Sequence, residues 1–206
     1  MRTGVIIAGG YSTRFGADDK AVADLAGKPM IRRVADRLVA PVDEILVNCR
    51  PAQRSGIEEA LFGLELPIQF AEDPEPDQGP MAGIMTGLEA ADGEYAAVVA
   101  CDMPFVSPAF VRYLFERADG HDAAVPQVED EWFQTTQAVY RAEPMAAACA
   151  EALERDEHKI IEPLFTLDYV VVDEREIRTH ADTDTFRNVN TRAELRDAAQ
   201  EFGDSK

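Results

Sequence analysis

The residues best suited to chemistry lie in a glycine-rich stretch near the amino terminus. It begins after the apolar run Val5–Ala8 with the pair Gly9-Gly10 and extends to Lys20. Paired glycines allow positive φ angles and expose their N–H groups, which together form a nest for an anion. Hydroxyl and basic side chains follow, as a loop that binds nucleotide phosphates requires. The candidate nucleotide-binding residues here are Ile7, Ala8, Gly9, Gly10, Ser12, Thr13, Arg14 and Lys20.

The spacing of this stretch excludes two widespread phosphate loops. A Rossmann fingerprint requires GxGxxG running into a helix, and a Walker A loop requires GxxxxGK followed by serine or threonine. Here the sequence reads AGGYSTRFGADDK, and the later Gly27-Lys28 pair is followed by proline. The structural alternative is a simple turn in which Arg14 and Lys20 are merely solvated. The whole spaced set favours a phosphate site over that alternative.

A second candidate is Asp102, which follows the apolar run Tyr95–Cys101 and precedes Pro104. If that run is a parallel strand, the carboxylate lies at the carboxyl edge of the sheet, where open α/β sheets bind ligands. A carboxylate oxygen there can hold Mg²⁺, which bridges protein and phosphate while it keeps much of its water. An aspartate after a strand is often only a turn former. We therefore expect Asp102 to bind Mg²⁺ only if the loop that carries Lys20 lies at the same edge of the sheet.

Further candidates are Asn48, Asp73, Gly79, Pro80, Asn188 and Asn190. Asn48 and Asp73 each close a short strand-like run, where a polar residue either contacts a ligand or forms an ordinary turn. Gly79 opens a predicted helix whose glycines, Gly83 and Gly87, suit either a ligand or close packing on a sheet. The two asparagines near the carboxyl terminus are two residues apart, so they share one face of an extended segment.

Short β-branched runs alternate with amphipathic segments of helical length along most of the chain. This pattern predicts one domain, residues 1–206, with a Rossmann-like three-layer α/β/α fold and a mostly parallel central sheet. The predicted strands are Gly4–Ala8, Glu44–Asn48, Ile68–Ala71, Tyr95–Cys101, Ala123–Pro126, Thr136–Tyr140 and Tyr169–Asp173. The predicted helices are Pro29–Val39, Gln53–Phe62, Pro80–Ala91, Pro108–Arg117, Glu143–Arg155 and Thr191–Glu201. The stretch VEDEWFQTTQAVYR predicts a small antiparallel insertion or an edge pair, in which Trp132 and Phe133 pack.

Composition and charge limit the environment and the partners of the chain. The 206 residues are 46% hydrophobic, and no segment approaches ~18 uninterrupted apolar residues, so we expect a cytoplasmic protein with no membrane contact. Three widely spaced cysteines indicate neither a disulfide framework nor a CxxC metal site. A net charge of −19 repels nucleic acid.

The run GGYSTRFGADDK with the following GKPM resembles the signature of nucleotidyltransferases, most closely that of the molybdenum cofactor guanylyltransferase family. Three further segments, EDPEPDQGPMAGI, ACDMPF and FRNVNTRAEL, are similar to segments of that family and occur in the same order. Together these segments cover Gly4 to Leu195. The resemblance implies that Lys20, Asp102 and Arg14 are catalytic and that Asp102 binds Mg²⁺.

The resemblance also implies a reaction, in which GMP passes from GTP to molybdopterin and pyrophosphate is released. Asp73 and Asn48 would then contact the nucleotide, and Asn188 and Asn190 would orient phosphate or pterin. Transient contacts with molybdenum insertion proteins and recipient molybdoenzymes are implied as well. CTP with molybdopterin, GTP with cobinamide phosphate or phospholactate, and a non-catalytic nucleotide-binding subunit stay open as alternatives, because base choice depends on a few contacts around Asp73.

The acidic residues are scattered over nearly every polar segment, which predicts adaptation to a salt-rich cytoplasm. Concentrated ions shorten the Debye length to ~3 Å at 1 M and so screen repulsion between surface charges. We expect the free energy of unfolding to rise between ~0.1 M and ~2 M KCl, as measured by denaturant titration. Equal stability at the two salt concentrations would contradict salt adaptation.

Overall fold

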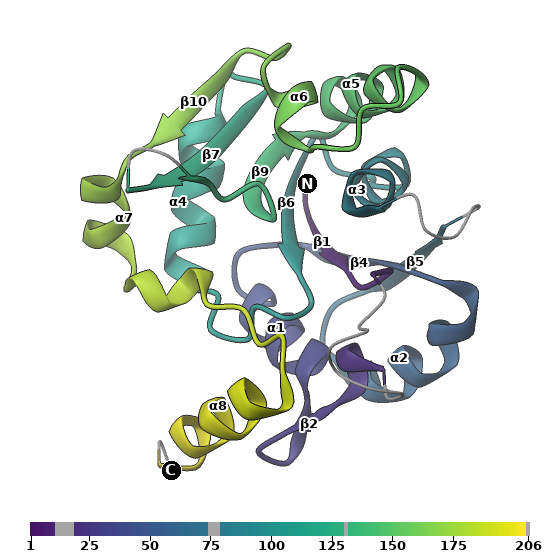
Figure 1. Ribbon diagram of the computed structural model, residues 1–206, viewed down its shortest axis with the longest axis vertical. Coiled ribbons are helices and arrows are strands. Elements are labelled where there is room, and N and C mark those ends of the chain that lie inside the picture. Colours follow the sequence, from purple (N-terminus) through teal and green to yellow (C-terminus); the bar gives the residue numbers. More distant parts are fainter. Residues whose placement is uncertain (11–18, 74–78, 130–131, 205–206) are drawn as a thin grey trace.

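The computed structural model describes residues 1–10, 19–73, 79–129 and 132–204. Over these residues the main sheet has the order β10-β7-β9-β6-β1-β4-β5, with β8 paired to β7 (Figure 1). β1 is parallel to its neighbours β4 and β6, so the three strands end at one edge. The strands are β1 (Arg2–Ile7), β2 (Asp24–Leu25), β3 (Lys28–Pro29), β4 (Glu44–Cys49), β5 (Ile68–Glu72), β6 (Tyr95–Ala100), β7 (Ala123–Val128), β8 (Trp132–Phe133), β9 (Gln137–Arg141) and β10 (Tyr169–Val172).

Helices cover both faces of the sheet and confirm the predicted three-layer α/β/α fold (Figure 1). One face packs against α1, α2, α4 and α7, and the other against α3, α5 and α6. The helices are α1 (Met30–Leu38), α2 (Arg54–Leu61), α3 (Gly79–Glu89), α4 (Pro108–Ala118), α5 (Ala142–Glu154), α6 (Ile161–Leu164), α7 (Glu174–His180) and α8 (Arg192–Asp204), with 3₁₀ helices η1 (Lys20–Val22), η2 (Pro51–Gln53) and η3 (Thr183–Phe186). In the described ranges, none of these helices has the length and apolarity that crossing a bilayer demands.

The alternation of side chains along β1 assigns them to the two helical layers. Val5 packs in the cluster that contains α3 and α5, whereas Ile6 packs in the cluster that contains α1 and α4. Both side chains are fully buried, as expected for a central strand of a parallel sheet. Burial on two faces fixes the register of β1 and therefore the point at which its chain leaves the sheet.

The antiparallel segment lies inside the sheet. β9 sits between β6 and β7 and is antiparallel to both, while β8 forms a short antiparallel pair with β7. The predicted insertion is therefore confirmed, and the alternative of an edge pair is wrong for β9. Trp132 is 65% exposed, so the expectation that it packs within this insertion is wrong. Phe133 does pack, edge to face, against Phe165 and Tyr169.

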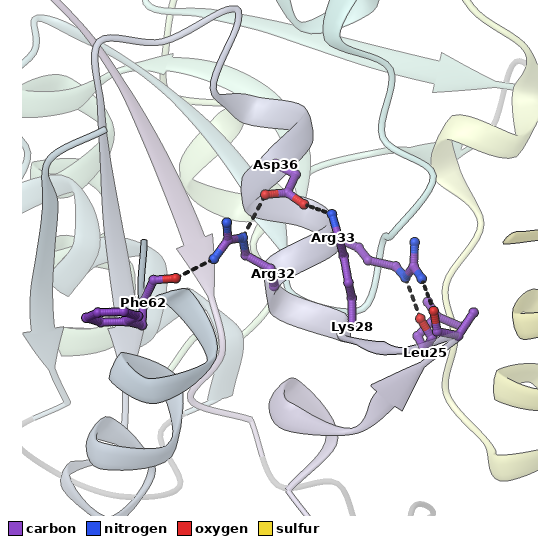
Figure 2. Close-up of polar contacts among 7 residues, drawn as sticks. Leu25, Lys28, Arg32, Arg33, Asp36 and Phe62 are labelled. Atoms are coloured by element: carbon purple, nitrogen blue, oxygen red, sulfur yellow. Dashed lines mark hydrogen bonds and ion pairs between the residues drawn. The ribbon is translucent and has the colours of Figure 1, made fainter. Parts of the chain in front are cut away.

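A hairpin of β2 and β3 follows the segment that carries Lys20. Its turn residues, Ala26 and Gly27, have φ angles of 53° and 82°, the positive pair that a two-residue hairpin turn requires. Arg33 of α1 holds the turn, because its guanidinium donates to the carbonyl oxygens of Leu25 and Ala26 at 2.6 and 2.8 Å (Figure 2). The hairpin is thus fixed to the first helix.

A second set of contacts joins the outer face of α1 to its surroundings. Lys28 and Arg32 both donate to the carboxylate of Asp36 at 2.7 Å, and Arg32 also donates to the carbonyl of Phe62 (Figure 2). Burial raises the pKa of Asp36, but the hydrogen bonds from Lys28 and Arg32 outweigh it and lower the pKa below its ordinary value. Lys28 of the GKPM segment is therefore paired with Asp36 of α1 and helps to hold the hairpin on this helix.

The carboxyl-terminal helix α8 lies beside β2 (Figure 1). Its Ala198 shares a small apolar cluster with Leu25 of the hairpin and Val189 of the preceding segment. The ring of Phe202 stacks on Phe105 with centroids 4.9 Å apart. This packing holds the end of the chain against the loop that follows β6. Thr191 and Glu194 form a capping box at the start of this helix, since each accepts a hydrogen bond from the main-chain N–H of the other.

The glycines of α3 serve close packing against the sheet. A Cβ atom on Gly87 would lie 2.7 Å from Val5, and one on Gly83 would lie 2.5 Å from the side-chain oxygen of Asn48. Both distances are far below van der Waals contact, so only glycine allows this helix to approach β1 and β4 so closely.

We expect Gly87→Ala to lower the free energy of unfolding by about 1–3 kcal/mol, because the added methyl group overpacks the buried Val5 side chain. Gly56→Ala in the exposed part of α2 is the matched control, since its Cβ atom would meet only Val22 at 3.7 Å. That control should gain up to ~1 kcal/mol from helix propensity. Urea denaturation measures both values, and equal effects of the two substitutions would contradict the packing argument.

Candidate active site

The candidate site lies at the edge where β1, β4 and β6 end. The main chain leaves β1 at Ala8, whose N–H donates to the carbonyl of Asn48 at 2.9 Å. The N–H of Cys101 donates to the carbonyl of Ile7 at 3.0 Å, so the segment that leads to Asp102 also lies beside the end of β1. Three segments far apart in the sequence therefore meet at the carboxyl edge, as expected for a ligand site of an open parallel sheet.

Lys20 joins the segment of Asp102 to a further segment near the carboxyl terminus, which carries Asn190. Its Nζ atom lies 2.5 Å from Oδ2 of Asp102 and 2.7 Å from Oδ1 of Asn190. The Lys20 and Asp102 side chains are only 9% and 18% exposed, so the ion pair is largely shielded from solvent. The N–H of Val189 donates to the carbonyl of Asp102 at 2.9 Å and holds the Asn190 segment in place. The structure thus brings together three of the predicted residues, Lys20, Asp102 and Asn190.

The second oxygen of Asp102 is buried and has no hydrogen-bond partner among the described residues. A buried carboxylate oxygen left unpaired is costly, and a bound cation removes that cost. No group of three histidine, cysteine, aspartate or glutamate side chains capable of holding a metal occurs in the described part of the chain. A single carboxylate fits Mg²⁺ best, because Mg²⁺ is commonly bound by one or two carboxylates together with substrate phosphates and water.

Asn48 and Asp73 form a second polar group beside Gly9. Asn48 is completely buried, and its side-chain N–H donates to Oδ1 of Asp73 at 2.6 Å. A Cβ atom on Gly9 would collide with the other oxygen of Asp73 and lie 3.2 Å from Oδ1 of Asn48. Burial raises the pKa of Asp73, although the hydrogen bond from Asn48 opposes the shift. Glycine is therefore required at position 9 for the chain to pass these two side chains.

Oδ1 of Asn48 is also buried without a partner among the described residues. It belongs to a side chain whose N–H₂ group is already used by Asp73 and, at 3.3 Å, by the carbonyl of Ala71. An unpaired acceptor and a carboxylate next to Gly9 suit a ligand that presents N–H or O–H donors. Guanine and ribose both present such donors.

The remaining predicted site residues are spread more widely. Gly79 has a φ of 80° and opens α3 together with Pro80. Asn188 is exposed, whereas Asn190, two residues on, contacts Lys20. Ser12, Thr13 and Arg14 lie outside the described residues. The roles of all these residues stay predictions.

Sequence reasoning missed two residues that support the site, Gln53 and Asp19. Gln53 is 6% exposed and donates both to the carbonyl of Ala8 and to the carboxylate of Asp19. Asp19 in turn caps η1, which begins with Lys20. The acidic pair before Lys20 was visible in the sequence, but nothing in the sequence marks a lone glutamine in PAQR as its partner.

The cysteines and histidines take no part in this arrangement. Cys49, Cys101 and Cys149 are buried as free thiols, and burial raises the pKa of Cys49 to about 11. A buried thiol of such high pKa is a poor nucleophile at neutral pH. The thiols therefore offer no reactive group at neutral pH.

An α/β fold with polar and glycine residues gathered at the carboxyl ends of parallel strands is typical of nucleotide-binding enzymes. A family model described as the MobA-like NTP transferase domain matches residues 4–169. The chain belongs to this MobA-like NTP transferase family and is a nucleotidyltransferase.

Two relatives and two solved structures support this placement. A protein of Natronomonas pharaonis named "Probable molybdenum cofactor guanylyltransferase" is 54% identical, with 97% of each chain covered. A Desulfosudis oleivorans protein named "Molybdenum cofactor guanylyltransferase" is 32% identical over 95% of this chain and 93% of its own. The crystal structure of molybdopterin-guanine dinucleotide biosynthesis protein A from Archaeoglobus fulgidus matches with a TM-score of 0.81 at 26% identity, covering 99% of this chain and 100% of that one. The 4-diphosphocytidyl-2C-methyl-D-erythritol synthase of Anaerococcus prevotii, 13% identical with a TM-score of 0.73 and coverage of 98% and 96%, shares the fold.

A double-mutant cycle tests the coupling of Lys20 and Asp102. We expect Lys20→Met and Asp102→Asn each to lower the free energy of unfolding by about 1–3 kcal/mol, because each leaves a buried partner unpaired. The double variant should lose less than the sum, with a coupling of at least ~1 kcal/mol. Lys28→Met with Asp36→Asn is the control cycle. Lys28 is 53% exposed, so that pair should couple by less than ~1 kcal/mol. Additive losses for Lys20 and Asp102 would show that the pair contributes nothing.

Proposed function

We propose that the chain transfers GMP from GTP to molybdopterin, which releases pyrophosphate and yields molybdopterin guanine dinucleotide. The observation that carries this proposal is the meeting of the Lys20 amine and the Asp102 carboxylate at the strand edge beside Gly9. The names of the relatives supply the substrate class, since both relatives described above are named as guanylyltransferases of the molybdenum cofactor.

In this reaction a terminal phosphate oxygen of molybdopterin forms a bond to the α-phosphorus of GTP. The bond from that phosphorus to the oxygen bridging to the β-phosphate breaks, and its electron pair leaves with pyrophosphate. A phosphate oxygen is already nucleophilic at neutral pH, so the protein supplies alignment and charge neutralisation in place of a general base. Lys20 and the Gly9 and Gly10 N–H groups serve this purpose, together with Arg14, Ser12 and Thr13.

Asp102 would hold Mg²⁺ through the oxygen that lacks a partner, while its other oxygen faces Lys20. When bound, Mg²⁺ would neutralise charge on the phosphates and orient the leaving pyrophosphate. Lys20 then lies on one side of the same carboxylate, held there by Asn190. Asp102 can therefore fix the separation of two positive charges around a triphosphate.

The Asn48 and Asp73 pair would recognise the nucleoside. A carboxylate accepts hydrogen bonds from N1–H and N2–H₂ of guanine, which adenine and cytosine do not present in the same arrangement. The unpaired oxygen of Asn48 offers one further acceptor beside Gly9. Gly79 and Pro80 would approach the nucleotide from the start of α3, and Asn188 and Asn190 would face the phosphates or the pterin.

Protein partners and location belong to the same proposal. Transient contact with molybdenum insertion proteins and recipient molybdoenzymes would deliver molybdopterin and receive the product, and both steps fit a cytoplasmic enzyme. A binding subunit without turnover would not require a shielded lysine beside a carboxylate with a free oxygen, so the site favours catalysis.

Pyrophosphate release with GTP, CTP or ATP in the presence of molybdopterin and Mg²⁺ tests the function. We expect turnover with GTP, and a loss of ~10²-fold or more in Lys20→Ala and Asp102→Ala, because each removes stabilisation of developing phosphate charge. Lys28→Ala, which alters an exposed lysine paired with Asp36, should keep the wild-type rate.

Several outcomes would contradict the proposal. Turnover only with CTP, or only with GTP and cobinamide phosphate or phospholactate, would show that the proposed substrates are wrong. The proposed nucleotidyl transfer would still hold. Absence of turnover with tight GTP binding would indicate a binding subunit. Wild-type rates in both Lys20→Ala and Asp102→Ala would remove these residues from the mechanism.

A further inference from the structure

Gln53 occupies a position between the two ends of the glycine-rich loop. Its side-chain Nε2 donates to the carbonyl oxygen of Ala8, the residue before the loop, at 3.0 Å. The same nitrogen lies 3.1 Å from each carboxylate oxygen of Asp19, the residue before Lys20. The side-chain amide of Gln53 thus links Ala8, which precedes Gly9, to Asp19, which precedes Lys20.

The contact with Asp19 reaches Lys20 directly. Asp19 is the N-cap of η1, and its Oδ1 accepts a hydrogen bond from the N–H of Ala21 at 3.1 Å. η1 begins with Lys20, so the orientation of Asp19 determines where the lysine side chain starts. Gln53 therefore acts on Lys20 through Asp19, without touching the lysine itself.

The other end of the Gln53 amide is also used. Its Oε1 accepts hydrogen bonds from the main-chain N–H and the side-chain Nε of Arg50, at 3.0 and 3.1 Å. These bonds fix which end of the amide faces Ala8 and Asp19. A side-chain amide can accept hydrogen bonds from Arg50 through its oxygen and donate to Ala8 and Asp19 through its nitrogen at the same time. A glutamate would repel Asp19, and an apolar residue would leave buried oxygens unpaired.

We propose that Gln53 is a positioning residue for the nucleotide phosphates, acting by holding Ala8 and Asp19 at a fixed separation. Ala8 sets the place of the Gly9 N–H, and Asp19 sets the place of Lys20. A site whose donors are already in place loses less conformational entropy when it binds a polyanion. Lys20 and the Gly9 N–H would neutralise charge on the leaving pyrophosphate, which GMP lacks, so Gln53 raises the affinity for GTP more than the affinity for GMP. This inference rests on the proposed function, since it assumes that GTP is the ligand.

The test measures dissociation constants for GTP and GMP by isothermal titration, together with melting temperatures. Gln53→Met keeps the length of the side chain but removes its hydrogen bonds to Ala8, Asp19 and Arg50. We expect its GTP affinity to fall about 10-fold and its GMP affinity to fall less than about 3-fold, because the loss concerns the outer phosphates.

Thr3→Val is the matched control at the opposite end of β1. Thr3 is fully buried and donates to Glu44 at 2.6 Å, so its replacement also removes a buried polar contact. We expect a lower melting temperature with an unchanged GTP to GMP preference. An equal change of that preference in Thr3→Val and Gln53→Met would reduce Gln53 to a purely structural role and overturn the inference.

Asp19→Ala is a second test variant, for which the loss of charge and the loss of positioning predict opposite changes in GTP affinity. Removing a negative charge near the phosphates should by itself strengthen anion binding. Loss of positioning should instead weaken GTP binding, and we expect GTP affinity to fall about 5-fold or more while GMP affinity changes less. Tighter GTP binding in Asp19→Ala, or an unchanged preference in a folded Gln53→Met, would overturn the inference. Failure of the wild-type protein to bind GTP would instead refute the proposed function.

Discussion

The ion pair of Lys20 and Asp102 is the contact on which the arrangement of the site depends. Burying two charges is costly unless they meet in good geometry and their other polar atoms are satisfied. The fold meets this condition for the lysine through Asn190, but within the described ranges no group donates a hydrogen bond to the second oxygen of Asp102. The lysine is therefore paired, whereas the carboxylate of Asp102 can still accept a cation or a hydrogen-bond donor. That combination is typical of a centre that binds a cation and a polyanion together.

The acidity of the chain makes this local arrangement more significant. A chain with a net charge of −19 repels anions such as nucleotides, so a phosphate site in such a chain needs local positive charge and hydrogen-bond donors. The candidate site offers both, because Lys20 is shielded from solvent beside Asp102 and main-chain N–H groups lie at a strand end. Main-chain N–H groups attract phosphate without carrying a net charge, so they form no ion pairs with the acidic side chains of the surface.

Much of the fold and part of the site could be predicted because they depend on local patterns. Fully apolar runs marked the central strands, and Lys20 and Asp102 were recognisable from the glycine-rich loop and from a strand end. The position of β9 inside the sheet was not predictable, since strand order depends on tertiary packing. Helix α7 was missed although Asp173 and Glu176 form a capping box at its start. Gln53 gave no signal, because its role exists only through the carbonyl of Ala8 and the carboxylate of Asp19.

The family match ends at residue 169, whereas Asn190, which contacts the lysine, lies beyond it. The segment that carries Asn190 is held by packing of α8 on the β2–β3 hairpin and by the stacking of Phe202 on Phe105. Substitutions on that helix can therefore shift Asn190, and with it the Lys20 amine that Asn190 contacts, without altering any strand. The carboxyl-terminal helix is therefore the part of the chain through which the position of the Lys20 amine can change while the ends of β1, β4 and β6 stay in place.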